Sequence, residues 1–191
     1  MRIISGSHRG LHLADVGAGD PAAHLRPTSD RVREAIFNLI TNGPYPDPVT
    51  GVRVLDLFAG TGALGLEALS RGAARVTFVD DGIPARALLR QNIDKMRATG
   101  ATDLWRRDAT ALGLNRDASY GLIFLDPPYR KGLGEAALAA AMAGGWVAPG
   151  AMIVWEEGTP PVPPQGFILL DQRKYGDTIV SLLRAPPAPT G

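Results

Sequence analysis

Short apolar runs alternate with longer amphipathic segments along most of the chain. The apolar runs are strand-like and cover residues 53–57, 75–79, 122–125 and 151–155, with weaker candidates at 104–107, 167–170 and 178–183. The amphipathic segments are helix-like and cover residues 63–71, 84–97 and 134–143. Strands that alternate with helices predict a parallel sheet with helices on both faces. Ligands of such sheets bind at the carboxyl ends of the strands.

The first 27 residues depart from this pattern. They contain all three histidines, several glycines and only short apolar pieces, which predicts an arm or small hairpin outside the main sheet. A helix is expected next, because apolar residues recur on one helical face of residues 27–40: Val32, Ile36, Leu39 and Ile40. Pro27 and Thr28 lie where this helix would begin. Arg31 and Arg33 fall off the apolar stripe, and a solvated face is one interpretation of them.

Composition narrows the class of protein. The 191 residues suit one domain, and the absence of cysteine excludes disulfides and thiolate metal sites, so no metal is expected. A formal net charge of +1 does not indicate a strongly basic nucleic-acid binder, although it allows local patches. No apolar run approaches the roughly 20 residues of a membrane span, and the N-terminus lacks the apolar stretch of a signal peptide. A cytoplasmic protein without membrane contact is therefore expected.

The stretch VLDLFAGTGALGLEAL (54–69) is typical of a strand, a glycine-rich turn and a helix. Gly60, Gly62 and Gly65 form a G-x-G-x-x-G pattern, whose first two glycines permit a tight turn and close approach of a ligand to the helix N-terminus. Asp80 follows 20 residues after Gly60, at the end of the next strand, where an acid can accept hydrogen bonds from ribose hydroxyls. Dinucleotides and S-adenosylmethionine both fit these features.

Asp56 separates the two cofactor classes. It ends the first strand, where a carboxylate would repel a pyrophosphate but attract a cofactor with an ammonium and a sulfonium group. The pattern D-x-F-A-G-x-G therefore favours S-adenosylmethionine. The alternative is that Asp56 only stabilises the turn. Asp108, after the third strand candidate, lies where an acid could contact adenine, or where a surface aspartate begins a helix.

The segment YGLIFLDPPYRKG (120–132) ends an apolar strand with a carboxylate, two prolines, an aromatic ring and two cations. Pro127 and Pro128 fix φ and remove two backbone donors, so the exit from the strand is stiff and rich in acceptors. Asp126 only accepts when ionised, and Tyr129 offers a flat face for stacking. The exocyclic amine of a nucleobase fits this combination. Acceptors that hold both of its hydrogens would direct the nitrogen lone pair at a methyl group. The alternative is a rigid strand exit with a packed tyrosine.

The acceptor chemistry favours guanine as the target. Guanine presents N1–H beside the N2 amine, whereas adenine presents one donor beside an acceptor, and an ionised Asp126 only accepts. Adenine stays possible, because its amine alone could be held. A paired base must be flipped out to reach the site, and stacking on Tyr129 would offset part of that cost. Arg130 and Lys131 follow and are expected to meet phosphate.

These stretches together resemble the bacterial 16S ribosomal RNA guanine-N2 methyltransferase family. The resemblance covers nearly the whole chain and includes RIISGSHRG near the start, RPTSDRVREAIFNLI (26–40), LDLFAGTGALGLEALSRGA (55–73), DPPYRKGL (126–133) and KYGDT (174–178). The glycine loop and DPPY occur in many methyltransferases. Residues 26–38 and 174–178 are much more specific to this family.

The resemblance implies an α/β fold, the Rossmann-like class I S-adenosylmethionine-dependent methyltransferase fold. Its seven-stranded, mostly parallel sheet carries helices on both faces and a small N-terminal β-hairpin arm. With the proline-rich ending, this predicts an arm over 1–27, a methyltransferase domain over 28–184 and a disordered tail over 185–191. The implied S-adenosylmethionine site consists of Asp56, Phe58, Ala59, Gly60, Gly62, Asp80 and Asp108. The implied catalytic residues are Asp126, Pro127, Pro128 and Tyr129. The residues implied to face RNA or the pocket entrance are Arg26, Thr28, Arg31, Arg33, Arg130 and Lys131.

Some residues depart from the family pattern. Asp80 stands where many members have Glu, and both acids accept from ribose. Leu11 and His12 stand where relatives are more basic, which removes charge from the arm.

Six cations against two acids between residues 86 and 107 fit either a phosphate-binding patch or a solvated helix face. With so modest a net charge, we expect a monomer that acts on 16S rRNA within an assembled or partly assembled small subunit.

Other functions fit the residues less well. An N6-adenine methyltransferase of the DPPY type, acting on DNA or RNA, is the nearest alternative. The intact Asp56, Asp80 and DPPY stretch disfavour a module that docks on the ribosome without catalysis. Asp56 and the lack of a hydride-transfer constellation disfavour a nicotinamide-dependent oxidoreductase.

Overall fold

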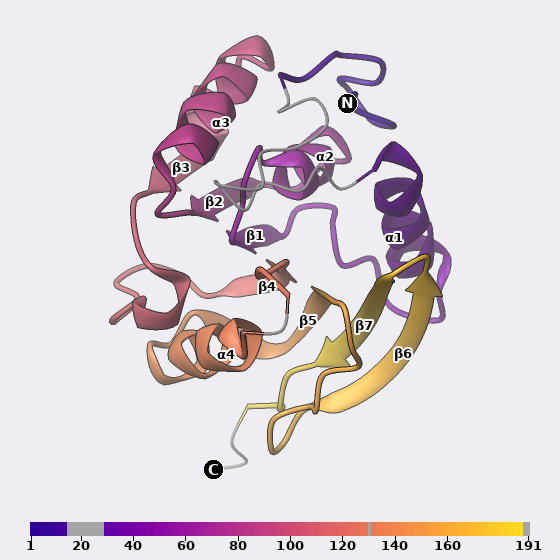
Figure 1. The fold of residues 1–191 in the computed structure, drawn as a ribbon, viewed down its shortest axis with the longest axis vertical. Coiled ribbons are helices and arrows are strands. Elements are labelled where there is room, and N and C mark those ends of the chain that lie inside the picture. The colour runs from indigo at the N-terminus through magenta and orange to yellow at the C-terminus, as the bar shows by residue number, and fades with distance from the viewer. Residues whose placement is uncertain (15–28, 130, 189–191) are drawn as a thin grey trace.

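The computed structural model describes residues 1–14, 29–129 and 131–188 (Figure 1). Within these residues, seven strands form one sheet in the order β3-β2-β1-β4-β5-β7-β6. The strands are β1 (Arg53–Leu57), β2 (Arg75–Val79), β3 (Thr102–Trp105), β4 (Tyr120–Leu125), β5 (Val147–Glu157), β6 (Ile168–Tyr175) and β7 (Thr178–Arg184). The helices are α1 (Asp30–Asn42), α2 (Ala63–Ser70), α3 (Ile83–Lys95) and α4 (Leu133–Ala143), with short 3₁₀ turns η1 (Thr99–Ala101) and η2 (Ala109–Ala111).

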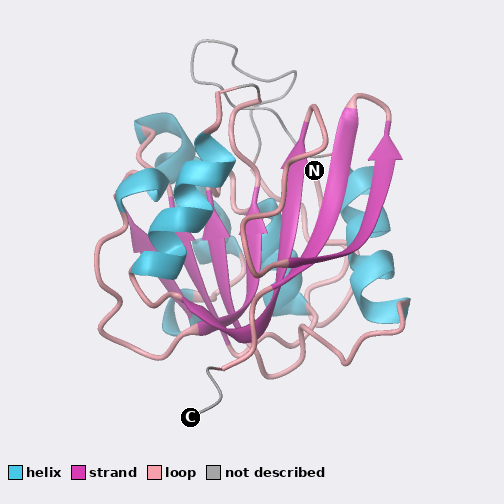
Figure 2. Cartoon of the chain, turned by 90° about the horizontal axis from the view of Figure 1, so that it is seen from below, coloured by secondary structure: helices cyan, strands magenta, loops and turns pink. Residues whose placement is uncertain are grey.

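Strand direction decides where a binding site can form. Strands β3, β2, β1, β4 and β5 are parallel, and β7 runs antiparallel between β5 and β6. The carboxyl ends of β1, β2, β4 and β5 therefore meet at one edge of the sheet, called here the carboxyl edge. This is the seven-stranded, mostly parallel sheet of a Rossmann-like class I methyltransferase, with helices on both faces (Figure 2).

The two faces of the sheet bury separate hydrophobic cores. Val54, Phe78 and Phe124 point to the face that α1, α2 and α3 cover. Leu55 and Trp155 point to the opposite face, which α4 covers. Because both faces are buried, inner strands of a parallel sheet are apolar at nearly every position. This explains why β1 and β2 have the same bounds in the sequence and in the structure.

Helix α1 begins one step later than expected from the sequence. Its N-cap is Ser29, whose Oγ accepts a hydrogen bond from the Val32 backbone N–H at 3.2 Å. The apolar face that the sequence predicts is directed at the sheet, where Phe37 packs against Phe124 with ring centroids 5.7 Å apart. This packing fixes α1 beside β4, close to the carboxyl edge.

The described part of the N-terminal arm folds back on itself outside the sheet. The Ile3 N–H donates to the Leu11 carbonyl at 2.9 Å, and the Gly10 N–H donates to the Ile3 carbonyl at 2.8 Å. Ile3 is fully buried and Leu13 is 5% exposed, and both join the core on the α1 face. The arm is therefore part of the folded core. The rest of the predicted arm, residues 15–27, lies outside the described residues.

Two buried polar side chains dock the arm on the helices. Glu67 of α2 is fully buried and accepts hydrogen bonds from the backbone N–H groups of Ile4 at 2.8 Å and Ser5 at 3.0 Å. The Asn92 side chain of α3 accepts from the Ala14 N–H at 2.6 Å and donates to the Ala14 carbonyl at 2.9 Å. These side chains replace the backbone partners that a strand in the sheet would have had.

Several strand boundaries differ from the sequence prediction. Strand β5 occupies Val147–Glu157 and not 151–155, and β4 begins at Tyr120 and not at residue 122. Strand β3 occupies Thr102–Trp105, not 104–107, because η1 ends at Ala101 and Thr102 then pairs with Val76 of β2. Strand β6 continues to Tyr175, well beyond 170, because it pairs with β7 along this length although most of its side chains are exposed. Backbone pairing at a sheet edge needs no apolar pattern, so the sequence does not show the full length of β6.

The predicted disordered tail begins too early. Ala185 is buried, and its N–H donates to the Ala151 carbonyl at 2.9 Å. The Pro186 carbonyl accepts from the Gly150 N–H at 2.9 Å. The ordered chain therefore extends at least two residues into that range, and residues 189–191 lie outside the described part. None of the described helices has the length and apolar character needed to cross a membrane.

Candidate active site

The glycine loop connects β1 to α2 at the carboxyl edge. Gly60 and Gly62 have φ of +55° and +78°, a conformation that glycine adopts without strain, and Phe58 shares it at +59°. The Ala59 N–H donates to the Val79 carbonyl at 3.2 Å, which fixes the loop to the neighbouring strand β2. At Gly65, a Cβ atom would lie 2.4 Å from the Phe78 ring. The third glycine therefore lets α2 pack closely on β2.

Asp56 lies behind this loop. It is 2% exposed, and its Oδ2 accepts a hydrogen bond from the Gly65 N–H at 3.0 Å. Burial raises the pKa of Asp56 well above its ordinary value; the Gly65 hydrogen bond lowers it, and the charges of Asp126 and Asp80 raise it again. In this structure Asp56 therefore makes the turn-stabilising contact that its alternative interpretation describes.

Asp80 ends β2 and holds the glycine loop from the side. Its Oδ2 accepts from the Gly60 N–H and its Oδ1 from the Gly82 N–H, both at 2.8 Å. Burial raises the pKa of Asp80, and the two backbone hydrogen bonds oppose that shift. Each carboxylate oxygen has a second lone pair, so Asp80 keeps the capacity to accept from a ligand. Asp108 is exposed and caps η2, accepting from the Thr110 N–H at 2.8 Å.

The DPPY stretch leaves β4 next to β1. The Asp126 N–H lies 3.5 Å from the Leu57 carbonyl, which places the Asp126 backbone beside the start of the glycine loop. Pro127 is buried, whereas Asp126, Pro128 and Tyr129 are half-buried. The structure thus brings the predicted cofactor and catalytic residues to one edge, because β1 and β4 are parallel neighbours.

Tyr129 is held by a segment far away in the sequence. Its hydroxyl forms a 2.8 Å hydrogen bond with Oγ1 of Thr178, the first residue of β7. A Cβ atom at Gly158 would lie 3.0 Å from the Tyr129 ring, so this glycine leaves room for the ring. Thr178 ends the KYGDT motif at 174–178. This motif therefore reaches the DPPY stretch.

Arg33 corrects one of the predictions from the sequence. It was expected to face RNA or the pocket entrance, but its side chain is fully buried between α1 and α2. Its Nη2 donates to Asp30 Oδ1 at 2.8 Å and to the Arg2 carbonyl, and its Nε lies 3.7 Å from Glu67 Oε2. Arg33 therefore ties α1 to the arm. Arg31 and Arg33 are two residues apart in the same RPT-x-D-R-x-R-E motif, and the sequence does not show that one is exposed and the other buried.

The remaining predicted RNA-facing residues divide into two groups. Arg31 and Lys131 are exposed, near the N-termini of α1 and α4. Arg26, Thr28 and Arg130 lie outside the described residues.

One of the cations of residues 86–107 is buried, and the others are exposed. Arg86 is 6% exposed and donates to the backbone carbonyl of Asp81. The Arg107 guanidinium stacks over Trp105, with 4.5 Å between its Cζ and the ring centroid. The other cations of the cluster are exposed: Arg90, Lys95, Arg97 and Arg106. These observations fit the solvated-face interpretation for most of the segment.

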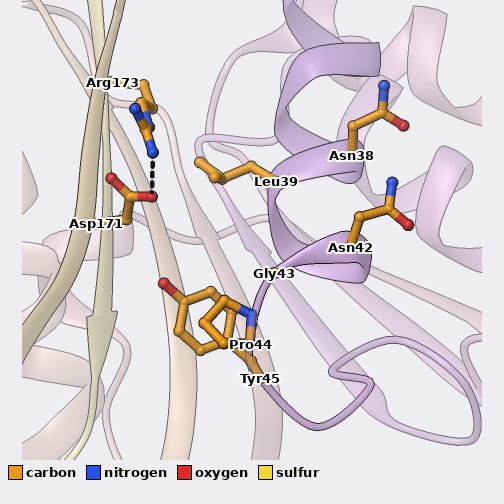
Figure 3. Close-up of a pocket in the computed structure, with 8 residues that line it drawn as sticks. All are labelled: Asn38, Leu39, Asn42, Gly43, Pro44, Tyr45, Asp171 and Arg173. Carbon is orange, nitrogen blue, oxygen red and sulfur yellow. Dashed lines mark hydrogen bonds and ion pairs between the residues drawn. The ribbon is translucent and has the colours of Figure 1, made fainter.

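A hollow of about 260 Å³ lies away from the carboxyl-edge residues, between α1 and β6 (Figure 3). It is lined by Asn38, Leu39, Asn42, Gly43, Pro44, Tyr45, Asp171 and Arg173. Arg173 and Asp171 form an ion pair at 3.0 Å within it. None of the residues predicted for the cofactor or the target base lines this hollow.

Sequence reasoning missed the buried acids Glu67 and Glu156, and it missed the contact that Thr178 of the KYGDT motif makes with Tyr129. Glu67 gave no local signal for its contact with the arm, which lies more than 60 residues earlier in the chain. Glu156 did give a signal, since it follows the apolar run 151–155 as Asp126 follows 122–125. An acid directly after a buried parallel strand lies at the carboxyl edge for the same reason in both cases.

Known proteins share this fold and these motifs. The family model for conserved hypothetical protein 95 matches residues 1–184. Ribosomal RNA small subunit methyltransferase D of Escherichia coli (strain K12) is 35% identical over 167 residues, which is 85% of this chain and 79% of that protein. The protein of the same name from Haemophilus influenzae is 32% identical over 181 residues, 92% of this chain and 89% of the other. The solved structure of yhhF from Escherichia coli has a TM-score of 0.82 at 33% identity and covers 98% of both chains. The chain therefore belongs to the family of the ribosomal RNA small subunit methyltransferase D proteins.

Proposed function

We propose that this protein transfers a methyl group from S-adenosylmethionine to the exocyclic N2 amine of a guanine in 16S rRNA of the small ribosomal subunit. The observation that carries the proposal is the position of Asp126, whose backbone lies beside the end of β1, where the glycine loop begins at the carboxyl edge. The family membership supports methyl transfer, and the names of the relatives support small-subunit rRNA as the substrate.

The residues at the carboxyl edge fit S-adenosylmethionine. The N-cap of α2 is Gly62, which has no side chain to cap the helix; the Gly65 N–H donates to Asp56, and the N–H groups before it face the loop side. Asp80 would accept from the ribose hydroxyls, while Asp56 would hold the first turn of α2 in place through its hydrogen bond with the Gly65 N–H. Phe58, Ala59 and Gly60 would form the backbone wall of the site, with Asp108 at its adenine end. When bound, this cofactor supplies an electrophilic methyl group.

The DPPY stretch would hold the target base. The N1–H and N2–H groups of guanine would donate to the Asp126 carboxylate and the Pro127 carbonyl, with the base stacked on Tyr129. Held in this way, the amine nitrogen would point its lone pair at the methyl group that the cofactor supplies, and it would lose one proton on gaining the methyl group. Pro127 and Pro128 keep the acceptors fixed, which lowers the reorganisation cost.

The substrate context follows from charge. A net charge of +1 indicates a weak hold on bare RNA. We therefore expect an assembled or partly assembled small subunit to be the substrate, with the exposed Arg31 and Lys131 near phosphate.

A substrate comparison tests the proposal. Purified protein would be incubated with labelled S-adenosylmethionine and small subunits, naked 16S rRNA or DNA, all from a strain that lacks the gene. We expect label in N2-methylguanosine of the subunits, and one methylguanosine missing from the 16S rRNA of that strain by mass spectrometry. Label in N6-methyladenosine would support the adenine alternative instead. Absence of S-adenosylmethionine binding by calorimetry would support a module without catalysis.

The hydrogen bond between Tyr129 and Thr178 gives a first prediction. The isosteric change Thr178→Val removes the hydroxyl that bonds the Tyr129 hydroxyl and so weakens the hold on the stacking position of the ring. We expect the methyl-transfer rate to fall by roughly tenfold, the value of about 1.4 kcal/mol for one lost hydrogen bond. Thr178→Ser keeps the hydroxyl and should retain most of the activity. Equal rates in the valine and serine variants would show that the hydrogen bond does not position the ring.

A further inference from the structure

The carboxyl edge contains a second acid beside Asp126 that the proposed mechanism leaves unused. Leu125 of β4 is paired with Trp155 of the parallel strand β5, so the following residues, Asp126 and Glu156, are neighbours. Side chains alternate along a strand, so both acids point to the face opposite to Trp155. That face is covered by α1 and α2 (Figure 1). Asp56 of β1 points to the same face, since it is paired with Phe124.

Glu156 is buried without a full set of partners. It is 3% exposed, and its Oε1 has no hydrogen-bond partner among the described residues. An ionised carboxylate in such a place would carry a large desolvation cost. The buried position therefore favours the protonated form, whose O–H needs an acceptor.

The charged groups around Glu156 come from several elements. Asp126 and Asp56 face it from the ends of β4 and β1, and both disfavour its charged form. Arg33 of α1 favours the charged form. This guanidinium is fully buried, and within the described residues its Nε and Nη1 make no hydrogen bond, although Nε is ion-paired with Glu67. In the sheet, Glu156 is paired with Val180 of β7, and Val180 is in turn paired with Arg173 of β6. Arg173 is bonded to Asp171.

The balance of these effects agrees with the geometry. Burial raises the pKa of Glu156 well above its ordinary value, Asp126 and Asp56 raise it further, and Arg33 lowers it. Two neighbouring buried carboxyls with one proton between them are a known arrangement for keeping one acid neutral and the other ionised. Asp126 is the more accessible of the pair, since it is half-buried whereas Glu156 is buried.

We propose that Glu156 is a positioning residue of the methyl-transfer site: its protonated carboxyl donates a hydrogen bond to Asp126 and so fixes Asp126 as an ionised acceptor for the target amine. The inference rests on the proposed function, because it assigns Asp126 its acceptor role. Loss of the Glu156 proton would place two like charges side by side and displace the Asp126 carboxylate. Methyl transfer should therefore fall as the pH rises through the deprotonation of Glu156.

Three variants test this role in the full-length protein. Glu156→Gln keeps the shape and an N–H donor but has no proton to lose. Glu156→Leu has a similar volume and no donor. Glu157→Gln is the matched control, because it changes the adjacent acid, which points to the other face of β5. Steady-state methyl transfer to small subunits would be measured between about pH 6 and pH 9.5, where a raised carboxyl pKa becomes visible.

The expected results distinguish two roles of Glu156: donating a hydrogen bond to Asp126, or only filling space. Glu156→Gln should stay within about threefold of the wild-type rate at neutral pH and lose the alkaline decline. Glu156→Leu should lose roughly 30-fold or more in kcat with little change in the KM for S-adenosylmethionine, and Glu157→Gln should keep the alkaline decline. An alkaline decline that persists in Glu156→Gln, or equal kcat in the glutamine and leucine variants, would overturn the inference.

A spectroscopic measurement keeps the inference separate from the proposed function. The infrared C=O stretch of a protonated carboxylic acid should be present at neutral pH in the wild type and in Glu157→Gln. Its intensity should decrease in Glu156→Gln. If that band does not change, the inference fails even when methyl transfer is observed. If the wild type methylates no RNA or DNA while the band behaves as expected, the proposed function fails and the protonated Glu156 stands.

The raised pKa of Glu156 also predicts how the stability of the protein depends on pH. Since the folded pKa of Glu156 is raised, the native state binds more protons than the unfolded state at pH values between the ordinary and the raised pKa. The free energy of unfolding therefore falls as the pH rises through that window. Glu156→Gln removes this cost, so its stability relative to the wild type should increase with pH. A constant difference would contradict a raised pKa.

Discussion

Replacing Asp126 by asparagine should reduce methyl transfer to guanine by about 10²- to 10⁴-fold, the range for a lost acceptor that is preorganised for the transition state. An asparagine amide directs two N–H donors at its surroundings, and one of them would oppose the N1–H donor of guanine. The other residues of the cofactor site, including Asp80 and the glycine loop, are untouched. The affinity for S-adenosylmethionine, measured by calorimetry, should therefore change little.

Asp117→Asn is a suitable control for this variant. Asp117 precedes β4 as Asp126 follows it, so the two changes lie at opposite edges of the sheet. Asp117 is exposed and pairs with Arg53 at 2.7 Å, far from the carboxyl edge, and its replacement should leave the rate within about twofold. An unchanged rate in Asp126→Asn would refute the acceptor role. A parallel loss of cofactor affinity would indicate that Asp126 belongs to the cofactor site instead.

The largest expected effect on stability comes from Glu67→Ala. Glu67 is fully buried and accepts from the Ile4 and Ser5 N–H groups and from Arg71 Nε at 2.7 Å. Its removal would also leave the buried Arg33 guanidinium without the nearest carboxylate on α2. Removing one partner of a buried ion pair costs about 3–5 kcal/mol. Urea unfolding should show a decrease of this size in the free energy of unfolding.

Amide hydrogen exchange would locate the effect of Glu67→Ala. The Ile4 and Ser5 amides should lose protection, because their acceptor is gone and the arm can separate from α2. Glu34→Ala, an exposed change on α1, is the control and should alter stability by no more than about 0.5 kcal/mol. Retained protection at Ile4 and Ser5 would show that apolar packing of Ile3 and Leu13 is sufficient to dock the arm.

The same carboxylate connects the arm to the site. Arg33 forms an ion pair with Glu67, and its charge also lowers the pKa of Glu156. Glu67→Ala therefore has a second expected consequence at the carboxyl edge. A shift in the position of Arg33 would change the charge balance that sets the protonation of Glu156 and, through it, of Asp126.

The sequence by itself determined the inner strands, the glycine loop and the DPPY stretch. Strands β1 and β2 are apolar throughout because both faces of the sheet bury them, and this local signal gave their bounds. Glycine at 60 and 62 reported a backbone conformation with positive φ, which is also local. Acids that directly follow such strands must lie at the carboxyl edge, so the positions of Asp56, Asp80 and Asp126 could be predicted from the chain.

Only the tertiary structure decided which of these side chains meet and which are accessible. Arg33 is buried on α1 because Glu67 and the arm close over it, and Tyr129 is fixed by Thr178, 49 residues later. Glu156 is next to Asp126 because β5 is paired in parallel with β4. The order of the strands along the chain does not by itself show which strands are neighbours in the sheet. The reason is physical: periodicity and backbone conformation are properties of neighbouring residues. Hydrogen bonds and burial between distant segments depend on how strands pair and helices pack, and they leave no pattern in the local sequence.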